Sequence, residues 1–268
     1  MLPDSPSDPV ERFLETKRGP ISYSDEGRGA VILALHGAPG SCRDWRWIGA
    51  VLEKDMRLIR LDLPGFGGTP LKTFPDPSFE GRADWIAEFL EQLGITSCVA
   101  LGHSAGGPLA MALASRHPER VRGLALISSV GLRPHRPFRR YPRMRRVSPF
   151  LRVPVLREVL TLILRQGFKA AGFPLGLSGE TIRQCMHVVG KVEFESFAEL
   201  LATLDLPALV AWADDDPLID ASISQELAES CPEGPRLHYA DGGHNIQKSK
   251  AVEIAESLIP WAGRVCEA

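Results

Sequence analysis

Short runs of aliphatic residues recur along the chain, and they lack the polar alternation of a strand with one face in water. Such runs are typical of parallel strands that are covered on both faces. Between the runs, apolar residues repeat at helical spacing. Strands that alternate with helices predict a mostly parallel sheet with right-handed crossovers. The predicted strands are residues 31–35, 58–61, 99–101, 124–127 and 209–212, and the predicted helices are 84–93, 105–116, 222–229 and 251–261.

The pattern departs from regular alternation at its start and in its middle. Residues 11–27 predict a leading antiparallel hairpin with its turn at residues 18–20. After residue 132 the chain becomes proline-rich and then helical, and regular alternation returns at residue 206. We therefore expect an α/β core formed by residues 1–132 and 193–268, with a helical insertion at 133–192.

The composition is that of an ordinary globular chain. Of 268 residues, 44% are hydrophobic and 24% are charged, which argues against intrinsic disorder. The formal net charge of −2 gives no overall attraction to nucleic acid, so we expect no such partner. No apolar stretch is long enough to cross a bilayer. The first residues lack the basic start and apolar run of a secretory signal.

The cysteines are odd in number, widely scattered and without a C-x-x-C pair. This arrangement argues against a disulfide framework and against a zinc site. It is typical of reduced thiols, and we therefore expect a cytoplasmic protein. The five residues are Cys42, Cys98, Cys185, Cys231 and Cys266.

The most specific motif is G-H-S-A-G-G at residues 102–107, which joins a predicted strand directly to a predicted helix. A serine in this context sits on a tight turn with its hydroxyl held clear of the backbone, and glycines two residues before and after it leave room for the turn. The helix begins beside Ser104, so free N–H groups face any oxyanion that develops there. We interpret Ser104 as a nucleophile.

A serine hydroxyl is a weak nucleophile and needs a base, which an acid in turn orients. His244 is the best candidate base, because two glycines precede it in a loop after a predicted strand at 237–239. The other six histidines are weaker candidates. The acid is expected at another strand end, between the serine and the histidine in the sequence. Asp214, Asp215 and Asp216 follow the strand at 209–212, and their spacing alone does not choose among them.

A tetrahedral anion needs two backbone donors. The N–H of Ala105, next to the serine, is one candidate. The segment H-G-A-P-G at residues 36–40 follows the strand at 31–35 and offers the N–H of Ala38 as the other. Pro39 has no N–H and cannot serve. The same segment also has the composition of an ordinary β-turn, and both interpretations can hold together.

Together these segments resemble the cap-bearing branch of the α/β-hydrolase family. The resemblance covers residues 12–262. It implies the α/β-hydrolase fold with a helical cap inserted after the sixth strand. It also implies that Asp216 is the acid, because Asp216 aligns with the acid of the family's G-x-x-D-P-L pattern, in which Ala213 replaces the usual glycine. The motifs that occur in family order are H-G-A-P-G at 36–40, L-D-L-P-G-F-G-G-T at 61–69, G-H-S-A-G-G at 102–107, A-D-D-D-P-L-I at 213–219 and G-G-H-N at 242–245.

The type of nucleophile narrows the classes of enzyme within the family that this resemblance implies. Epoxide hydrolases and haloalkane dehalogenases of this fold use aspartate where this chain has Ser104. The epoxide hydrolases also use two cap tyrosines, whereas the insertion has only Tyr141. The dehalogenases typically carry tryptophan after the nucleophile, where this chain has Ala105. Proline iminopeptidases carry G-G-S-W-G instead.

The resemblance therefore implies a serine hydrolase of small-molecule carboxylic esters, with an apolar acyl or aryl group and no metal or organic cofactor. C–C bond hydrolases, lactonases and acyltransferases share the triad and stay open. A non-catalytic binding protein on the same fold is a further alternative.

The insertion is strongly basic. From residue 133 to 191 it has thirteen Lys or Arg residues and two acids, and seven of the arginines fall within 133–146. Basic residues beside apolar ones favour contact with an anionic lipid surface or a phosphate-bearing substrate such as acyl-CoA. Alternatively, the arginines pair with acids of the core on a solvated face.

An apolar stripe follows at 153–164. With Phe168, Phe173, Leu175 and Met186, it either lines an acyl pocket or merely packs on the core.

Overall fold

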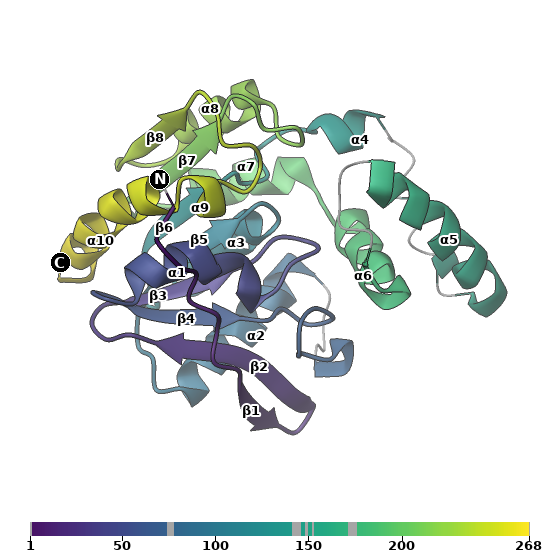
Figure 1. The fold of residues 1–268 in the computed structure, drawn as a ribbon, viewed down its shortest axis with the longest axis horizontal. Coiled ribbons are helices and arrows are strands. Elements are labelled where there is room, and N and C mark those ends of the chain that lie inside the picture. The colour runs from purple at the N-terminus through teal and green to yellow at the C-terminus, as the bar shows by residue number, and fades with distance from the viewer. Residues whose placement is uncertain are drawn as a thin grey trace.

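The computed structural model describes residues 2–73, 78–140, 146–147, 150–151, 153–170 and 176–267. An eight-stranded sheet with the order β1-β2-β4-β3-β5-β6-β7-β8 runs through the molecule (Figure 1). β2 pairs antiparallel with β1 and β4, and all other neighbours are parallel. The strands are β1 Arg12–Thr16, β2 Gly19–Glu26, β3 Val31–Leu35, β4 Arg57–Leu61, β5 Cys98–His103, β6 Val121–Ile127, β7 Ala208–Ala213 and β8 Arg236–Tyr239.

Helices cover both faces of this sheet, which confirms the predicted fold class. In the described residues they are α1 Arg46–Leu52, α2 Phe79–Gln92, α3 Gly106–Arg116, α4 Arg136–Arg140, α5 Pro154–Ala170, α6 Gly179–Gly190, α7 Phe194–Ala202, α8 Ala221–Ser230, α9 Ile246–Ser249 and α10 Ala251–Glu267. Short 3-10 helices occupy Cys42–Trp45 and Leu71–Thr73.

The aliphatic runs belong to two cores at once. In β3, Leu33 and Leu35 join the core that contains α2 and α3, whereas Ile32 and Ala34 join the core that contains α1 and α10. A strand buried on both faces needs apolar residues at every position, because successive side chains point to opposite faces. This is why the runs lack polar alternation.

Two helices, α2 and α10, differ from the predicted ranges by more than one residue at an end. α2 begins five residues earlier, because the Ser78 hydroxyl accepts a hydrogen bond from the N–H of Gly81 at 3.0 Å and caps the helix. α10 continues past Pro260 to Glu267. Burial of its apolar face against the sheet stabilises the helix by more than the loss of one backbone hydrogen bond at Pro260 destabilises it. α1 was not predicted, because a seven-residue helix shows only two turns of periodicity.

Between β6 and β7 the described residues form α4, α5, α6 and α7. α5 and α6 pack against each other on the side of the molecule away from α10 (Figure 1). The Gln184 side chain of α6 donates to the Pro64 carbonyl at 3.1 Å and ties α6 to the loop after β4. The predicted boundaries of the insertion stay a prediction. None of the helices in the described ranges combines the length and apolarity needed to cross a membrane.

Candidate active site

Ser104 occupies a strained turn between β5 and α3. Its φ is +53°, a left-handed conformation that is unusual for a residue other than glycine. The flanking glycines are required by close approach: a Cβ on Gly106 would lie 2.1 Å from the Leu35 carbonyl oxygen, and one on Gly102 would lie 2.5 Å from the Gly106 carbonyl oxygen. The turn is the strand-to-helix elbow that the sequence predicts.

The loop after β3 lies against this turn. A Cβ on Gly37 would be 3.1 Å from the Cβ of Ser104, so only glycine lets the two loops approach this closely. Ala38 and Ala105 line one pocket. Ala105 follows Ser104 in the chain, and Ala38 follows Gly37, the residue that approaches the serine. Their N–H groups are therefore candidate donors to a developing oxyanion.

His36 holds this loop in place. Its Nε2 accepts a hydrogen bond from the N–H of Leu63 at 3.0 Å, so this nitrogen carries no proton. The proton then lies on Nδ1, which donates to the Gly37 carbonyl at 2.6 Å. The first residue of the H-G-A-P-G motif thus fixes the backbone beside Ser104, and its imidazole is fully engaged in doing so.

His244 and Asp216 form a direct pair. His244 Nδ1 lies 2.8 Å from Asp216 Oδ2, and their side chains are 11% and 2% exposed. Asp216 Oδ1 accepts hydrogen bonds from the N–H groups of Leu218 and Ile219 at 2.8 and 3.0 Å. Burial alone would raise the pKa of Asp216, but His244 and these two N–H groups outweigh it, and the pKa lies below its ordinary value. The carboxylate is ionised, and it orients the imidazole through Nδ1.

The neighbouring aspartates have other contacts. Asp215 accepts a hydrogen bond from the N–H of Gly243 at 2.7 Å, which fixes the residue before His244. Asp214 lies 2.8 Å from His238 Nε2 on the surface. The structure therefore joins only Asp216 of the three to His244, as the family pattern implies.

His103 links the serine turn to the histidine loop. Its Nε2 donates to the His244 carbonyl at 3.0 Å, and the two rings lie 4.9 Å apart. Burial, followed by the charge of His244, lowers the pKa of His103 to about 3. The residue before Ser104 is therefore a neutral donor that holds the backbone of His244.

A narrow pocket opens beside Ala38 and Ala105. Its volume is about 20 Å³, room for about one water molecule. His36 and Arg82 are among its lining residues, and burial lowers the pKa of the Arg82 guanidinium to about 10. The apolar lining includes Leu63, Phe66, Trp85, Ile86, Leu109 and Val188.

This lining differs in part from the predicted one. Val188 of α6 lines the pocket, and Phe168 packs on the small cluster of Phe66, Cys185 and Val188. On α5 the pocket interpretation was wrong for Val155, Leu156, Val159 and Ile163, which are exposed, whereas Leu160 and Leu164 of the same predicted stripe are half-buried outside the lining set. Met186 is buried outside the lining set, and Phe173 and Leu175 lie outside the described residues.

Comparison with known proteins places this geometry in a family. The family model for the alpha/beta hydrolase fold matches residues 30–251. The chain belongs to the α/β-hydrolase family. The chain is 35% identical over 125 residues to haloalkane dehalogenase 2 of Mycobacterium tuberculosis, an alignment that covers 46% of this chain and 44% of that protein.

Two further similar proteins match a larger part of this α/β-hydrolase. The dihydrolipoyllysine-residue acetyltransferase component of the acetoin cleaving system from Cupriavidus necator is 29% identical over 86% of this chain and 63% of its own length. The chain thus spans less than two thirds of both relatives. The structure of a thermophilic esterase from Thermogutta terrifontis is 23% identical, covers 97% of this chain and 99% of that one, and has a TM-score of 0.72. At that identity the likeness supports the fold alone.

Sequence reasoning missed one buried histidine of this α/β-hydrolase near the pair. His135 packs on Phe138 and Phe194, with ring centroids 4.8 and 5.9 Å away. Burial, followed by the charge of His244, lowers its pKa to about 4, so the ring is neutral near pH 7. A histidine in a proline-rich basic segment carries no sequence signal for such burial.

The five cysteines are free, and all except the half-buried Cys266 are buried. Burial raises the pKa of Cys185 to about 12, so this thiol stays protonated. Across the described residues, no cluster of three or more His, Cys, Asp or Glu side chains suits a metal ion.

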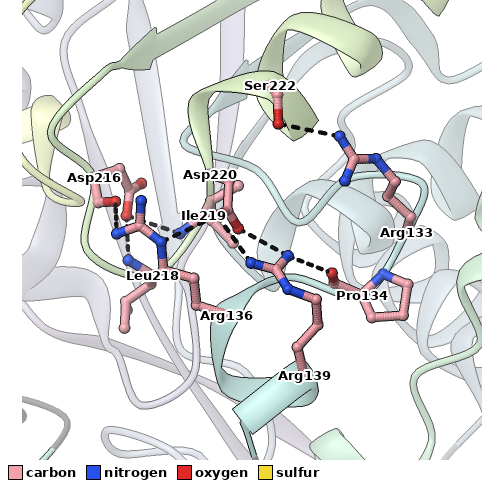
Figure 2. A network of polar contacts seen from close by, with 9 residues as sticks. All are labelled: Arg133, Pro134, Arg136, Arg139, Asp216, Leu218, Ile219, Asp220 and Ser222. Carbon is pink, nitrogen blue, oxygen red and sulfur yellow. Dashed lines mark hydrogen bonds and ion pairs between the residues drawn. The ribbon is translucent and has the colours of Figure 1, made fainter.

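Arginines of the insertion bind the loop that carries Asp216 (Figure 2). Arg136 donates to the Asp216 carbonyl oxygen and to Asp220 Oδ1, both at 3.1 Å. Arg139 donates to both oxygens of Asp220, at 3.1 and 2.9 Å. Arg133 binds Ser222 and Glu226 of α8 instead. For these three arginines, the pairing with core acids is confirmed.

Removal of the two loop-binding arginines is expected to reduce turnover. We expect Arg136→Gln with Arg139→Gln to lower kcat on the order of tenfold, because the Asp216 loop loses its fixed position. Stability should fall only slightly, because solvent screens these half-exposed ion pairs. Arg133→Gln is the matched control and should leave kcat within about twofold. Equal losses of kcat in both variants would contradict a positioning role.

Proposed function

We propose that this chain is a serine hydrolase that cleaves carboxylic esters with an apolar acyl or aryl group through an acyl-enzyme on Ser104. The observation that carries the proposal is the buried Asp216–His244 pair, tied through His103 to the turn that bears the serine. The esterase from Thermogutta terrifontis on the same fold is consistent with it.

The proposed reaction proceeds in two halves. Ser104 Oγ attacks the ester carbonyl carbon while His244 Nε2 takes the hydroxyl proton, since Nδ1 is held by Asp216. The anionic oxygen is bound by the N–H groups of Ala38 and Ala105, each worth on the order of 3 kcal/mol. The C–O bond of the ester then breaks, and the alcohol leaves with the proton from His244.

The second half returns the enzyme to its starting state. His244 takes a proton from water, whose oxygen attacks the acyl carbon. The acyl–Ser104 bond breaks, the proton passes to Ser104 Oγ, and the carboxylic acid is released. Asp216 stays ionised throughout and stabilises the imidazolium. No metal or organic cofactor is needed in either half.

Aliphatic and aromatic side chains dominate the pocket lining beside Ala38 and Ala105, and this favours an apolar group on the substrate. The pocket of about 20 Å³ would have to widen to admit such a group. We expect p-nitrophenyl esters to be hydrolysed, with initial rates that peak at one acyl length. The measurement is a series of initial rates over increasing acyl length, with fluorophosphonate labelling of Ser104 in parallel. Labelling without hydrolysis at any length would replace the ester with a C–C, lactone or acyl-transfer substrate. Absence of both would favour a binding protein.

A further inference from the structure

A short stretch of the insertion, residues 150–163, contains most of the exposed large apolar side chains, and five of them lie on α5. Eleven large hydrophobic residues are exposed in the described part of the chain, and seven of them lie within residues 150–163. On α5, Val155 is 79% exposed and Ile163 is 62% exposed. A soluble chain scatters such residues singly, whereas a contiguous set marks a surface that meets an apolar partner.

These side chains form one stripe on α5. Val155, Val159, Leu162 and Ile163 follow at i, i+4, i+7 and i+8, the spacing of a single helical face. The opposite side of the helix packs on the protein. Thr161 there is buried, and its Cγ2 would lie 3.2 Å from a Cβ on Gly179 at the start of α6. The orientation of α5 is therefore fixed with its apolar stripe outward, at the outer edge of the molecule (Figure 1).

Positive charge accompanies the stripe. Arg165 and Lys169 are exposed on α5, four residues apart, and therefore lie on one side of the helix. The one acid of α5, Glu158, is bound by Arg157 at 2.9 Å. Arg133, Arg136 and Arg139 are paired with Glu226 and Asp220, so the charge that we assign to this face is that of Arg165 and Lys169 on α5.

We propose that the outward face of α5 binds the surface of a bilayer that contains anionic phospholipid. The stripe inserts among the acyl chains near the headgroups, and Arg165 and Lys169 contact lipid phosphates. An exposed apolar stripe with basic residues along its edge is the pattern of a helix that lies in the membrane interface. The positive charge favours this occupant over a second copy of the chain, because two such faces would repel each other.

The test is co-sedimentation of the full chain with vesicles of phosphatidylcholine alone or with 30% phosphatidylglycerol. We expect binding to the anionic vesicles, weaker binding to the neutral ones, and a loss of binding as salt rises from about 0.1 to 0.5 M. Arg165→Gln with Lys169→Gln should weaken binding on the order of 20-fold, since each basic residue near the surface contributes about fivefold. Lys17→Gln with Lys54→Gln, at exposed sites elsewhere, should leave it unchanged.

A second pair of variants tests the apolar stripe. Val159→Asp with Ile163→Asp should lower the bound fraction at least tenfold, whereas Phe13→Asp, at an exposed apolar site on β1, should not. Far-ultraviolet circular dichroism is expected to be unchanged in all variants, and Ser104→Ala should bind like the parent, which separates binding from the proposed hydrolysis. Equal binding to neutral and anionic vesicles would overturn the proposal. So would a dimer in solution that Val159→Asp with Ile163→Asp dissociates, without vesicle binding by the parent.

Discussion

Ser104→Ala is expected to lower kcat for p-nitrophenyl esters on the order of 10⁶-fold and to abolish fluorophosphonate labelling. The hydroxyl is the proposed nucleophile, and neither His244 nor the oxyanion donors can replace the bond that it forms. The fold should survive, because the turn depends on Gly102 and Gly106 more than on the serine oxygen. The measurements are initial rates, mass spectrometry after labelling, and the thermal midpoint.

Ser128 offers a matched control for this variant. It follows β6, the neighbour of β5, and has a φ of +42°, so it also holds a left-handed conformation at a strand end. Ser128→Ala removes the same atom from a similar backbone and should leave kcat within about threefold. A comparable loss of activity in both variants would assign the effect to the turns and would remove the nucleophile assignment.

Asp216→Asn is expected to lower kcat on the order of 10⁴-fold. The amide keeps the size of the carboxylate but loses its charge, so the imidazolium that forms during turnover is no longer stabilised. Asp214→Asn, at a surface pair with His238, is the control and should retain full activity. Equal activity of the Asp216→Asn and Asp214→Asn variants would transfer the role of the acid away from Asp216.

Asp216 also makes the free energy of unfolding depend on pH, and the Asp216→Asn variant tests this. Because the folded pKa of Asp216 is lowered from 3.8, its ionised form adds stability that is fully present above pH 3.8. That contribution is lost as the pH falls through the lowered folded value. The difference in unfolding free energy between the parent and Asp216→Asn should therefore narrow below about pH 3.8, as measured by urea titration at pH 7 and pH 3.

The sequence predicted the sheet and the central site because both rest on local signals. A strand buried on both faces is a continuous apolar run, and the serine turn is a glycine-flanked motif between strand and helix. The choice of Asp216 came from a family pattern, and its contact with His244 agrees with that choice. By contrast, the outward face of α5 could not be predicted, because an apolar stripe has the same spacing whether it meets the core or the solvent.

Contacts between distant segments were equally hidden from the sequence. The sequence offered pairing of the arginines with core acids as one alternative, but nothing local indicates that Arg136 reaches the Asp216 carbonyl across 80 positions. His135 is buried and packs against Phe138 and Phe194, the second of which lies more than fifty residues away in the sequence. Such contacts depend on where the insertion folds back, which its proline-rich start does not determine.

The loops that carry Ser104, Asp216 and His244 are separate from most of the segment between β6 and β7, so the reaction and the substrate selectivity can evolve separately. Ser104, Asp216 and His244 follow β5, β7 and β8, whose parallel register fixes where these loops emerge. As far as its residues are described, the segment between β6 and β7 contributes no strand to the sheet. Apart from Arg136 and Arg139, which hold the Asp216 loop, substitutions can therefore accumulate in that segment while strand pairing stays intact, so the substrate range of a lineage can drift faster than its reaction.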